Sequence, residues 1–171
     1  MVVRAARILS ICTGAGALDL GIRIACPDTR TVCYCEREAF AVAHLVTAVE
    51  AGFLDSAPIW DDMRTFDCGP WRGKVDWLIG GIPCQPYSYA GKREGEADER
   101  NLWPDTARLI RELGPELIFL ENVSGITQYY HESIRPELRA MGYKTQEGLF
   151  SAAEVGAPHE PNTPNLSLIH I

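Results

Sequence analysis

The sequence predicts an α/β protein built on a mostly parallel, doubly wound sheet, that is, a sheet with helices on both faces. Two observations lead to this prediction. Short apolar stretches alternate with helical patterns along the chain, and such alternation is typical of parallel sheets. Parallel strands end at a common edge, where ligands gather, so the groups that follow the apolar stretches should meet in one crevice. These groups are Gly14, Glu36, Asp62, Cys84 and Glu121.

The first two strand–helix repeats are the clearest. An apolar run at residues 7–13 (RILSICT) predicts the first strand, and the Gly14-Ala15-Gly16 turn separates it from a helix at 17–25. β-Branched residues predict the second strand at 31–35, and an alanine-rich stretch predicts a helix at 38–51.

Strands and helices also alternate in the later part of the sequence. Further strands are expected at 58–60, 75–79 (VDWLI), 116–120 (ELIFL) and 143–152. Further helices are expected at 102–113 and 134–141. The Gly80-Gly81 pair is expected to break the fourth strand, and a polar loop continues from it to about Asn101.

Composition limits the class of protein. The chain has 171 residues, with 46% hydrophobic and 23% charged, which suits one globular core. No apolar run approaches the ~20 residues that cross a bilayer. The first residues lack the sections of a signal peptide, so a cytoplasmic location is expected, in a prokaryote or from a phage gene. A monomer is also expected.

Cysteine usage and charge add two constraints. The six cysteines are irregularly spaced and are interpreted as reduced thiols. A metal site formed by Cys33, Cys35, Cys26 and His44 is disfavoured, because the apolar setting favours buried structural cysteine and a second paired motif is missing. The net charge of −7 suits DNA contact only if another segment supplies basic residues.

Three groups point to a cofactor that contains adenosine. The glycines of the first turn allow a ligand to approach the backbone beside a helix N-terminus. Glu36 ends the second strand, where an acid can bond ribose hydroxyls, and Asp62 can accept a bond from an adenine amino group. A structural turn and solvated acids are the alternative for each feature taken alone.

A second pair of groups points to covalent chemistry. Cys84 stands between two prolines after a strand and a diglycine, so its thiol is expected to face the crevice as a nucleophile. This loop carries no histidine that could act as its base, so the electrophile must be activated by another group. Glu121 follows a very apolar strand, where desolvation should raise its pKa and let it act as an acid. A capping or turn role is the alternative for Glu121.

CTGAGALDLG (residues 12–21), PCQPYS (83–88) and ENV (121–123) resemble the shared motifs of the DNA cytosine-5 methyltransferases, in matching order across about residues 7–159. The resemblance implies a Rossmann-like S-adenosylmethionine-dependent methyltransferase fold, incomplete at the C-terminus, acting on double-stranded DNA. It implies that Cys84 attacks C6 of a flipped-out cytosine while Glu121 protonates N3, after which C5 takes the methyl group. Asn122 would hold the loop that contains Pro83 and Gln85.

The same resemblance assigns a cofactor pocket for S-adenosylmethionine. Glu36 would bind ribose, and Asp62 and Met63 would contact adenine. The other implied pocket residues are Cys12, Thr13, Gly14, Gly16, Ala17, Gly81 and Leu102. Two of them depart from the family pattern, which usually has Phe where Cys12 stands and Gly where Ala17 stands. The family occurs in restriction–modification systems, in phages and as solitary enzymes, and these alternatives stay open.

The C-terminal residues predict a truncated catalytic domain. Residues 1–159 are expected to form a partial cofactor-binding and catalytic domain, without the target-recognition region. A proline-rich stretch at 160–165 (EPNTPN) stands where the family has an arginine-rich strand, and LSLIHI matches one frame of a common transposase adapter. Residues 160–171 are therefore expected to be a non-native tail, with a natural short strand as the alternative.

Two other functions compete with a methyltransferase. The chain could be an inactive fragment that binds S-adenosylmethionine without recognising DNA. A nicotinamide-dependent dehydrogenase would explain the glycines and Glu36 but gives no reason for the PCQ and ENV motifs.

Overall fold

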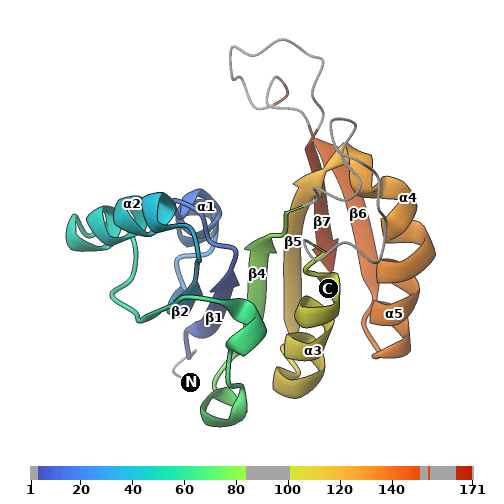
Figure 1. Cartoon of the computed structure of the whole chain (residues 1–171), viewed down its shortest axis with the longest axis horizontal. Coiled ribbons are helices and arrows are strands. Elements are labelled where there is room, and N and C mark those ends of the chain that lie inside the picture. Colours follow the sequence, from blue (N-terminus) through green and yellow to red (C-terminus); the bar gives the residue numbers. More distant parts are fainter. Residues whose placement is uncertain (1–3, 84–100, 151–153, 155–164, 171) are drawn as a thin grey trace. The chain divides into compact units, whose positions relative to one another are not determined.

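The computed structural model describes residues 4–83, 101–150, 154 and 165–170. The chain divides into two compact units. Unit 1 comprises Met1–Gly81 and Arg108–Ile118, and unit 2 comprises Ile82–Ala107 and Phe119–Ile171. The elements are labelled along the chain in Figure 1.

Unit 1 contains the parallel sheet that the sequence predicts. Its strands are β1 (Ala6–Ile11), β2 (Thr29–Cys35), β3 (Ile59–Trp60) and β4 (Trp77–Gly81). They lie in the order β3-β2-β1-β4, and each neighbouring pair is parallel. The register between β1 and β2 shifts between Ile8 and Leu9, which is the mark of a bulge. All four strands therefore point their carboxyl ends to one edge.

Two helices accompany β1 and β2 in unit 1 (Figure 1): α1 (Ala17–Ala25) and α2 (Ala39–Glu50). Gly16 precedes α1 with φ 82°, in the left-handed region that glycine adopts at no steric cost. A Cβ at Gly16 would also collide with the side chain of Leu54. Leu54 belongs to a buried cluster with Tyr34 and Leu45, so this glycine brings the first turn close to the core.

Asp76 joins three segments at the opposite, amino edge of the same sheet. Its carboxylate accepts bonds from the backbone N–H of Arg7 at 2.8 Å and from the Arg7 guanidinium at 2.8 and 2.9 Å. The Asp76 N–H donates to the Arg7 carbonyl, and the Asp76 carbonyl accepts from the N–H of Glu116. The starts of β1, β4 and the fifth strand are thus fixed at one residue. The Arg7 guanidinium holds the pKa of Asp76 well below its usual range.

The third helix and the fifth strand contribute residues to both units. They are α3 (Trp103–Leu113) and β5 (Leu117–Val123). A helical stretch follows β5 in unit 2: a 3-10 turn η4 (Ser124–Ile126), α4 (Thr127–Tyr129), the π-helical η5 (Tyr130–Ile134) and α5 (Arg135–Ala140). The antiparallel pair β6 (Thr145–Phe150) and β7 (Asn165–His170) completes the described part of unit 2.

Three expectations about the elements need correction. The diglycine does not break the fourth strand, because Gly80 and Gly81 are its last residues. A Cβ at Gly80 would collide with the Ile11 carbonyl, so glycine here serves the close approach of β4 to β1. Glu121 and Asn122 likewise lie inside β5 and do not follow it. The last helix, expected at 134–141, is preceded by about ten further helical residues. Gly125 and the adjacent pair Tyr129 and Tyr130 interrupt the apolar periodicity there, so the sequence did not predict this part as helix.

β7 lies in the segment that we expect to be a non-native tail. Strand pairing does not reveal the origin of a segment, so this expectation stays a prediction.

Within the described residues, the structure has no helix both long and apolar enough to cross a bilayer.

Candidate functional site

The turn between β1 and α1 is built around left-handed backbone. Cys12 has φ 47°, and Gly14 has φ 59°. Left-handed backbone is uncommon for a residue other than glycine, so the structure around Cys12 must hold it in place. The N–H of Thr13 donates to the Cys35 carbonyl, which ties the turn to the end of β2. A Cβ at Gly14 would meet no heavy atom within 4 Å, so this side of the turn is open to a ligand.

Glu36 stands at the end of β2 and organises the same turn. Its carboxylate accepts the N–H of Gly14 at 2.6 Å, and also those of Arg37 and Glu38 at 2.8 Å each. Charge-assisted bonds of this kind are among the stronger ones in proteins. Glu36 is thereby fixed in orientation beside the glycines, where the sequence predicted a ribose-binding acid.

Asp62 follows β3 and caps a short 3-10 helix, η1 (Met63–Thr65). Its carboxylate accepts the N–H of Arg64 at 3.0 Å and pairs with the Arg64 guanidinium, at 2.6 Å for the nearer contact. These bonds to Arg64 lower the pKa of Asp62. The Arg64 side chain is exposed, so it can move aside for a ligand at little cost.

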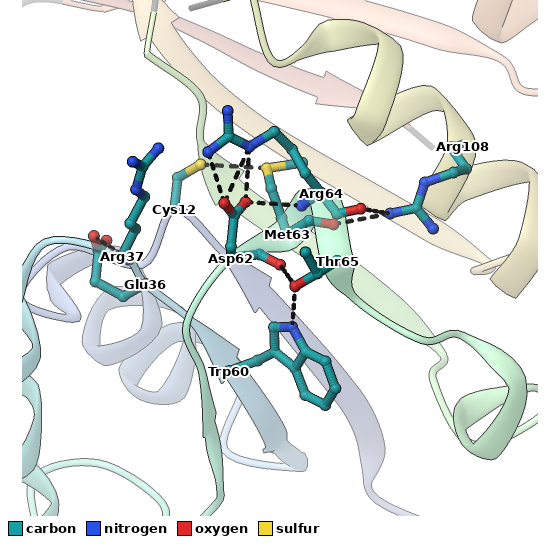
Figure 2. A network of polar contacts seen from close by, with 9 residues as sticks. All are labelled: Cys12, Glu36, Arg37, Trp60, Asp62, Met63, Arg64, Thr65 and Arg108. Carbon is teal, nitrogen blue, oxygen red and sulfur yellow. Dashed lines mark hydrogen bonds and ion pairs between the residues drawn. The ribbon is translucent and has the colours of Figure 1, made fainter.

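Cys12 and Met63 bring the two turns together, as Figure 2 shows. The Cys12 thiol lies 3.7 Å from the Met63 sulfur, and Met63 is buried to 4% exposure. Burial raises the pKa of Cys12 to about 12, and the negative charges of Glu36 and Asp62 add to the effect. Cys12 is therefore a neutral thiol at physiological pH and supplies packing to this site. The structure thus gathers the predicted residues Cys12, Gly14, Glu36, Asp62 and Met63 in unit 1.

A buried polar network that the sequence did not predict underlies the turn. Asp19, on α1 and only 3% exposed, accepts bonds from the hydroxyls of Ser10 at 2.8 Å and Thr31 at 3.1 Å. The Thr13 hydroxyl donates in turn to the Ser10 hydroxyl. Burial raises the pKa of Asp19 to about 6. The sequence did contain a signal for this network. Asp19 stands between Leu18 and Leu20 in a short helix, and an acid that is buried with apolar neighbours requires hydrogen-bond partners.

Arg108 is the second residue that sequence reasoning missed. It lies on α3, and its guanidinium donates to the Met63 carbonyl at 2.8 Å and the Phe66 carbonyl at 3.2 Å. Met63 is the first residue of η1 and Phe66 follows its last, so Arg108 holds the segment that carries Asp62 and Met63. Figure 2 shows the contact of Arg108 with this segment. An arginine within an amphipathic helix gives no sequence signal for such a role.

The predicted acid and its neighbour lie in unit 2. Along β5, Ile118, Leu120 and Asn122 are buried, while Glu121 points to the other face and is half-buried. Burial raises the pKa of Glu121, as the sequence predicted. The Asn122 side-chain amide donates to the Ile82 carbonyl at 2.9 Å. That bond fixes the backbone just before Pro83, as a loop-holding role for Asn122 requires.

The remaining predicted residues have varied surroundings. Thr13 and Gly16 are buried in the first turn, Ala17 is the exposed first residue of α1, and Gly81 ends β4. Leu102 is half-buried just before α3, and Pro83 is exposed. Cys84 and Gln85 lie outside the described residues. Among the described residues, no cluster of three metal-ligating side chains is present.

The residues of unit 1 fit a cationic adenosine cofactor better than a dinucleotide. Glu36 and Asp62 place two carboxyl groups around Cys12. Carboxylates attract a sulfonium or an ammonium group and accept bonds from hydroxyls, but they repel a pyrophosphate. The N–H of Gly14 also donates to the Glu36 carboxylate, so this donor is not available to a phosphate. The two carboxylate acceptors are consistent with the ribose hydroxyls and the cationic groups of S-adenosylmethionine.

Solved structures identify the fold. The S. pombe Dnmt2 methyltransferase superposes with a TM-score of 0.75 at 21% identity, covering 97% of this chain and 51% of that chain. A Spodoptera frugiperda DNMT2 mutant gives a TM-score of 0.70 at 20% identity, covering 96% of this chain and 49% of that chain. This chain therefore has the Rossmann-like fold of S-adenosylmethionine-dependent methyltransferases.

Sequence comparison then narrows the class. A family model described as "C-5 cytosine-specific DNA methylase" matches residues 6–160, and the chain belongs to this family. The Type II methyltransferase M.NgoMIV of Neisseria gonorrhoeae is 35% identical over 159 residues, which cover 86% of this chain. M.PspPI of Psychrobacter sp. (strain TA137), also a Type II methyltransferase, is 37% identical over 126 residues, or 73% of this chain. The matches span only 46% and 29% of these two relatives.

Proposed function

We propose that this chain is the cofactor-binding and catalytic part of a DNA (cytosine-5) methyltransferase that uses S-adenosylmethionine. The observation that carries the proposal is the Glu36 carboxylate, which three backbone N–H groups fix beside the glycine turn. Membership of the C-5 cytosine-specific DNA methylase family supports the reaction type. Double-stranded DNA is the proposed substrate, and residues beyond this chain supply its recognition. A cytoplasmic monomer is part of this proposal, and the two relatives reported above are bacterial proteins.

The proposed cofactor site has a distinct task for each residue. Glu36 accepts bonds from ribose hydroxyls, and Asp62 accepts one from the adenine amino group after Arg64 moves aside. Met63 packs against the adenine through its polarizable sulfur. The first turn lines the methionine part with Cys12, Thr13, Gly14, Gly16 and Ala17, and Gly81 belongs to the same site. Leu102 is a further cofactor contact that the family resemblance implies. S-Adenosylmethionine supplies an electrophilic methyl group there.

The proposed catalytic step depends on two other groups of this chain. The Cys84 thiolate adds to C6 of a cytosine that has left the duplex, since the ring faces are covered inside the stack. Glu121 donates a proton to N3, and its raised pKa supports that task because it keeps more of the acid protonated near neutral pH. Asn122 holds the backbone at Ile82, which positions Pro83 and the PCQ motif with Cys84 and Gln85.

Calorimetry on the 171-residue chain tests the cofactor site. We expect S-adenosylhomocysteine to bind, and the dinucleotide NADH not to bind, because the acidic site repels its pyrophosphate. Binding of NADH in preference to S-adenosylhomocysteine would refute the cofactor assignment and favour a dehydrogenase.

Covalent trapping tests the catalytic step. The protein encoded by the complete reading frame that contains residues 1–159 is incubated with duplex DNA containing 5-fluorocytosine and with S-adenosylmethionine. Release of the cysteine from C6 requires loss of the C5 proton, and fluorine in its place cannot be removed by a base. We therefore expect a denaturation-resistant adduct of protein and DNA, and none with Cys84→Ser. Absence of the adduct from a protein that binds the cofactor would remove Cys84 from its role.

The length of the chain favours a second function for these 171 residues alone. The matches span less than half of the two relatives reported above. As an isolated unit, the chain would then bind S-adenosylmethionine without methyl transfer. Calorimetric binding together with no incorporation of labelled methyl groups into DNA would support this function.

A further inference from the structure

The 3-10 helix η1 is held at both of its ends. At its start, the Asp62 carboxylate accepts the N–H of Arg64 at 3.0 Å. The Arg108 guanidinium donates to the carbonyls of Met63 at 2.8 Å and Arg64 at 3.4 Å within η1, and to the carbonyl of Phe66 at 3.2 Å just after it. The Met63 carbonyl also accepts the N–H of Phe66, so Arg108 adds a second donor to the turn that closes η1.

A guanidinium is suited to this task. Arginine carries five N–H donors in a rigid plane and stays charged at all accessible pH values, so one side chain can serve several carbonyls at once. Lysine offers a compact point charge and cannot span the same set. Arg108 contacts two of the three carbonyls of η1 and the carbonyl of the residue that follows it, so η1 has little freedom to rotate.

The orientation of η1 decides where two side chains point. Asp62 precedes η1 and Met63 is its first residue. Met63 is buried against Cys12, while its own carbonyl is the nearest acceptor of Arg108. Rotation of this segment would move the carboxylate of Asp62 and the sulfur of Met63 together.

We propose that Arg108 is a positioning residue for adenine: by fixing the carbonyls of η1, it sets Asp62 and Met63 in the orientation that recognises the adenine amino group. This inference rests on the proposed cofactor site. Arg108 itself contacts no ligand and acts through the backbone of η1.

The second contact of Arg108 provides a control. Arg108 also pairs with Glu112 at 3.4 Å, four residues along the same helix, and Glu112 pairs with exposed Arg72 at 3.8 Å. Arg72→Met therefore disturbs Glu112 without touching η1. An effect that comes through Glu112 would appear in both variants, and an effect through η1 only in Arg108→Met.

The experiment compares two ligands on the 171-residue chain by calorimetry: S-adenosylhomocysteine, and S-inosylhomocysteine, in which an oxygen replaces the adenine amino group. We expect the unmodified chain to prefer the adenine ligand by about tenfold or more, as for a hydrogen bond to a charged group. Arg108→Met should reduce this preference to about threefold or less, and Arg72→Met should leave it unchanged. Thermal melting reports the folding of each variant.

The outcomes separate this inference from the proposed function. Failure of the unmodified chain to bind either ligand would refute the proposed cofactor site. Binding of both ligands to the unmodified chain without any preference would refute the contact between Asp62 and the adenine amino group, and with it the role of Arg108. A preference that survives in folded Arg108→Met would overturn the role of Arg108 and leave the cofactor site intact. A merely structural role would weaken both ligands by the same factor. If Arg108→Met does not fold, the preference for the adenine ligand is measured in Arg108→Lys, which keeps the charge but cannot contact all three carbonyls. The same reduction of the preference is expected.

Discussion

Asp62 in unit 1 and Glu121 in unit 2 are both carboxyl groups near the carboxyl ends of strands, yet their surroundings shift their pKa values in opposite directions. Asp62 accepts a backbone N–H and a guanidinium from Arg64, which lower its pKa. Glu121 is half-buried on β5, and burial raises its pKa. Asp62 is therefore equipped to stay charged and to accept bonds, whereas Glu121 is equipped to hold a proton.

This difference shows that a position near the end of a strand does not by itself determine whether a carboxyl group favours its charged or its neutral form. Donors around a carboxylate favour its charged form, and apolar surroundings favour its neutral form. Asp19 illustrates the balance within one side chain, because two hydroxyls donate to it and burial still raises its pKa to about 6.

Glu36→Gln tests a carboxylate that, like Asp62, is surrounded by hydrogen-bond donors, and it should have the largest effect on cofactor binding. The amide of glutamine loses the charge that three N–H groups stabilise, and one of its ends becomes a donor that faces the N–H of Gly14 or Arg37. We expect S-adenosylhomocysteine to bind about a hundredfold more weakly, measured by calorimetry. Glu38→Gln, at an exposed neighbour, should bind normally, and equal losses in both variants would contradict a specific role for Glu36.

Asp19→Asn tests whether burial alone can dominate. The folded pKa of about 6 lies above the ordinary value of about 4, so the folded state binds the proton more tightly. Its contribution to stability is present below pH 4 and is lost as the pH rises through 6. The free energy of unfolding of the unmodified chain should therefore fall by roughly 2 kcal/mol relative to Asp19→Asn between pH 4 and pH 7.5.

Urea unfolding at several pH values measures this difference. A constant gap between the two proteins across the range would show that Asp19 does not titrate there.

Asn122→Ala tests the support of the catalytic side. The Ile82 carbonyl loses the donor that it has at 2.9 Å, and Ile82 is buried. We expect a loss of about 1.5 kcal/mol in the free energy of unfolding, measured by urea titration. Gln128→Ala, at an exposed site of the same unit, serves as the control and should change stability little. Equal stability of both variants would argue against a structural bond at Ile82.

Arg64→Met should have the smallest effect, and it should strengthen binding. Arg64 occupies both oxygens of Asp62 but is exposed, and exposed ion pairs contribute little free energy. Removing the competitor should lower the Kd for S-adenosylhomocysteine by about threefold. Weaker binding would instead mean that Arg64 orients Asp62 for the ligand.

Local pattern was enough to predict much of the fold. The helix at 17–25 has the predicted bounds, and β1 and β2 were placed within two residues at each end, because apolar strands and glycine turns are local signals. Gly80 was misread as a breaker, since its real constraint is the Ile11 carbonyl on a neighbouring strand. Such contacts join residues far apart in sequence, and a single sequence does not display them.

The site was predictable to the same extent. Glu36 and Asp62 lie after β2 and β3 as predicted, Glu121 lies inside β5, and the roles of all three stay predictions. The raised pKa of Glu121 was predictable from its apolar strand. Asp19 and Arg108 act through partners on other elements: Ser10 and Thr31 for Asp19, and the carbonyls of η1 for Arg108.

The junction at Asp76 has a consequence for how this protein tolerates change. Because the starts of β1 and β4 are aligned there, the length of each strand decides which of its residues lies at the opposite, carboxyl edge of the unit 1 sheet. A residue inserted between Arg7 and Cys12 would turn every later side chain of β1 to the opposite face. The number of residues between this junction and the carboxyl end of each strand must therefore be kept, because it determines which side chains face the carboxyl edge.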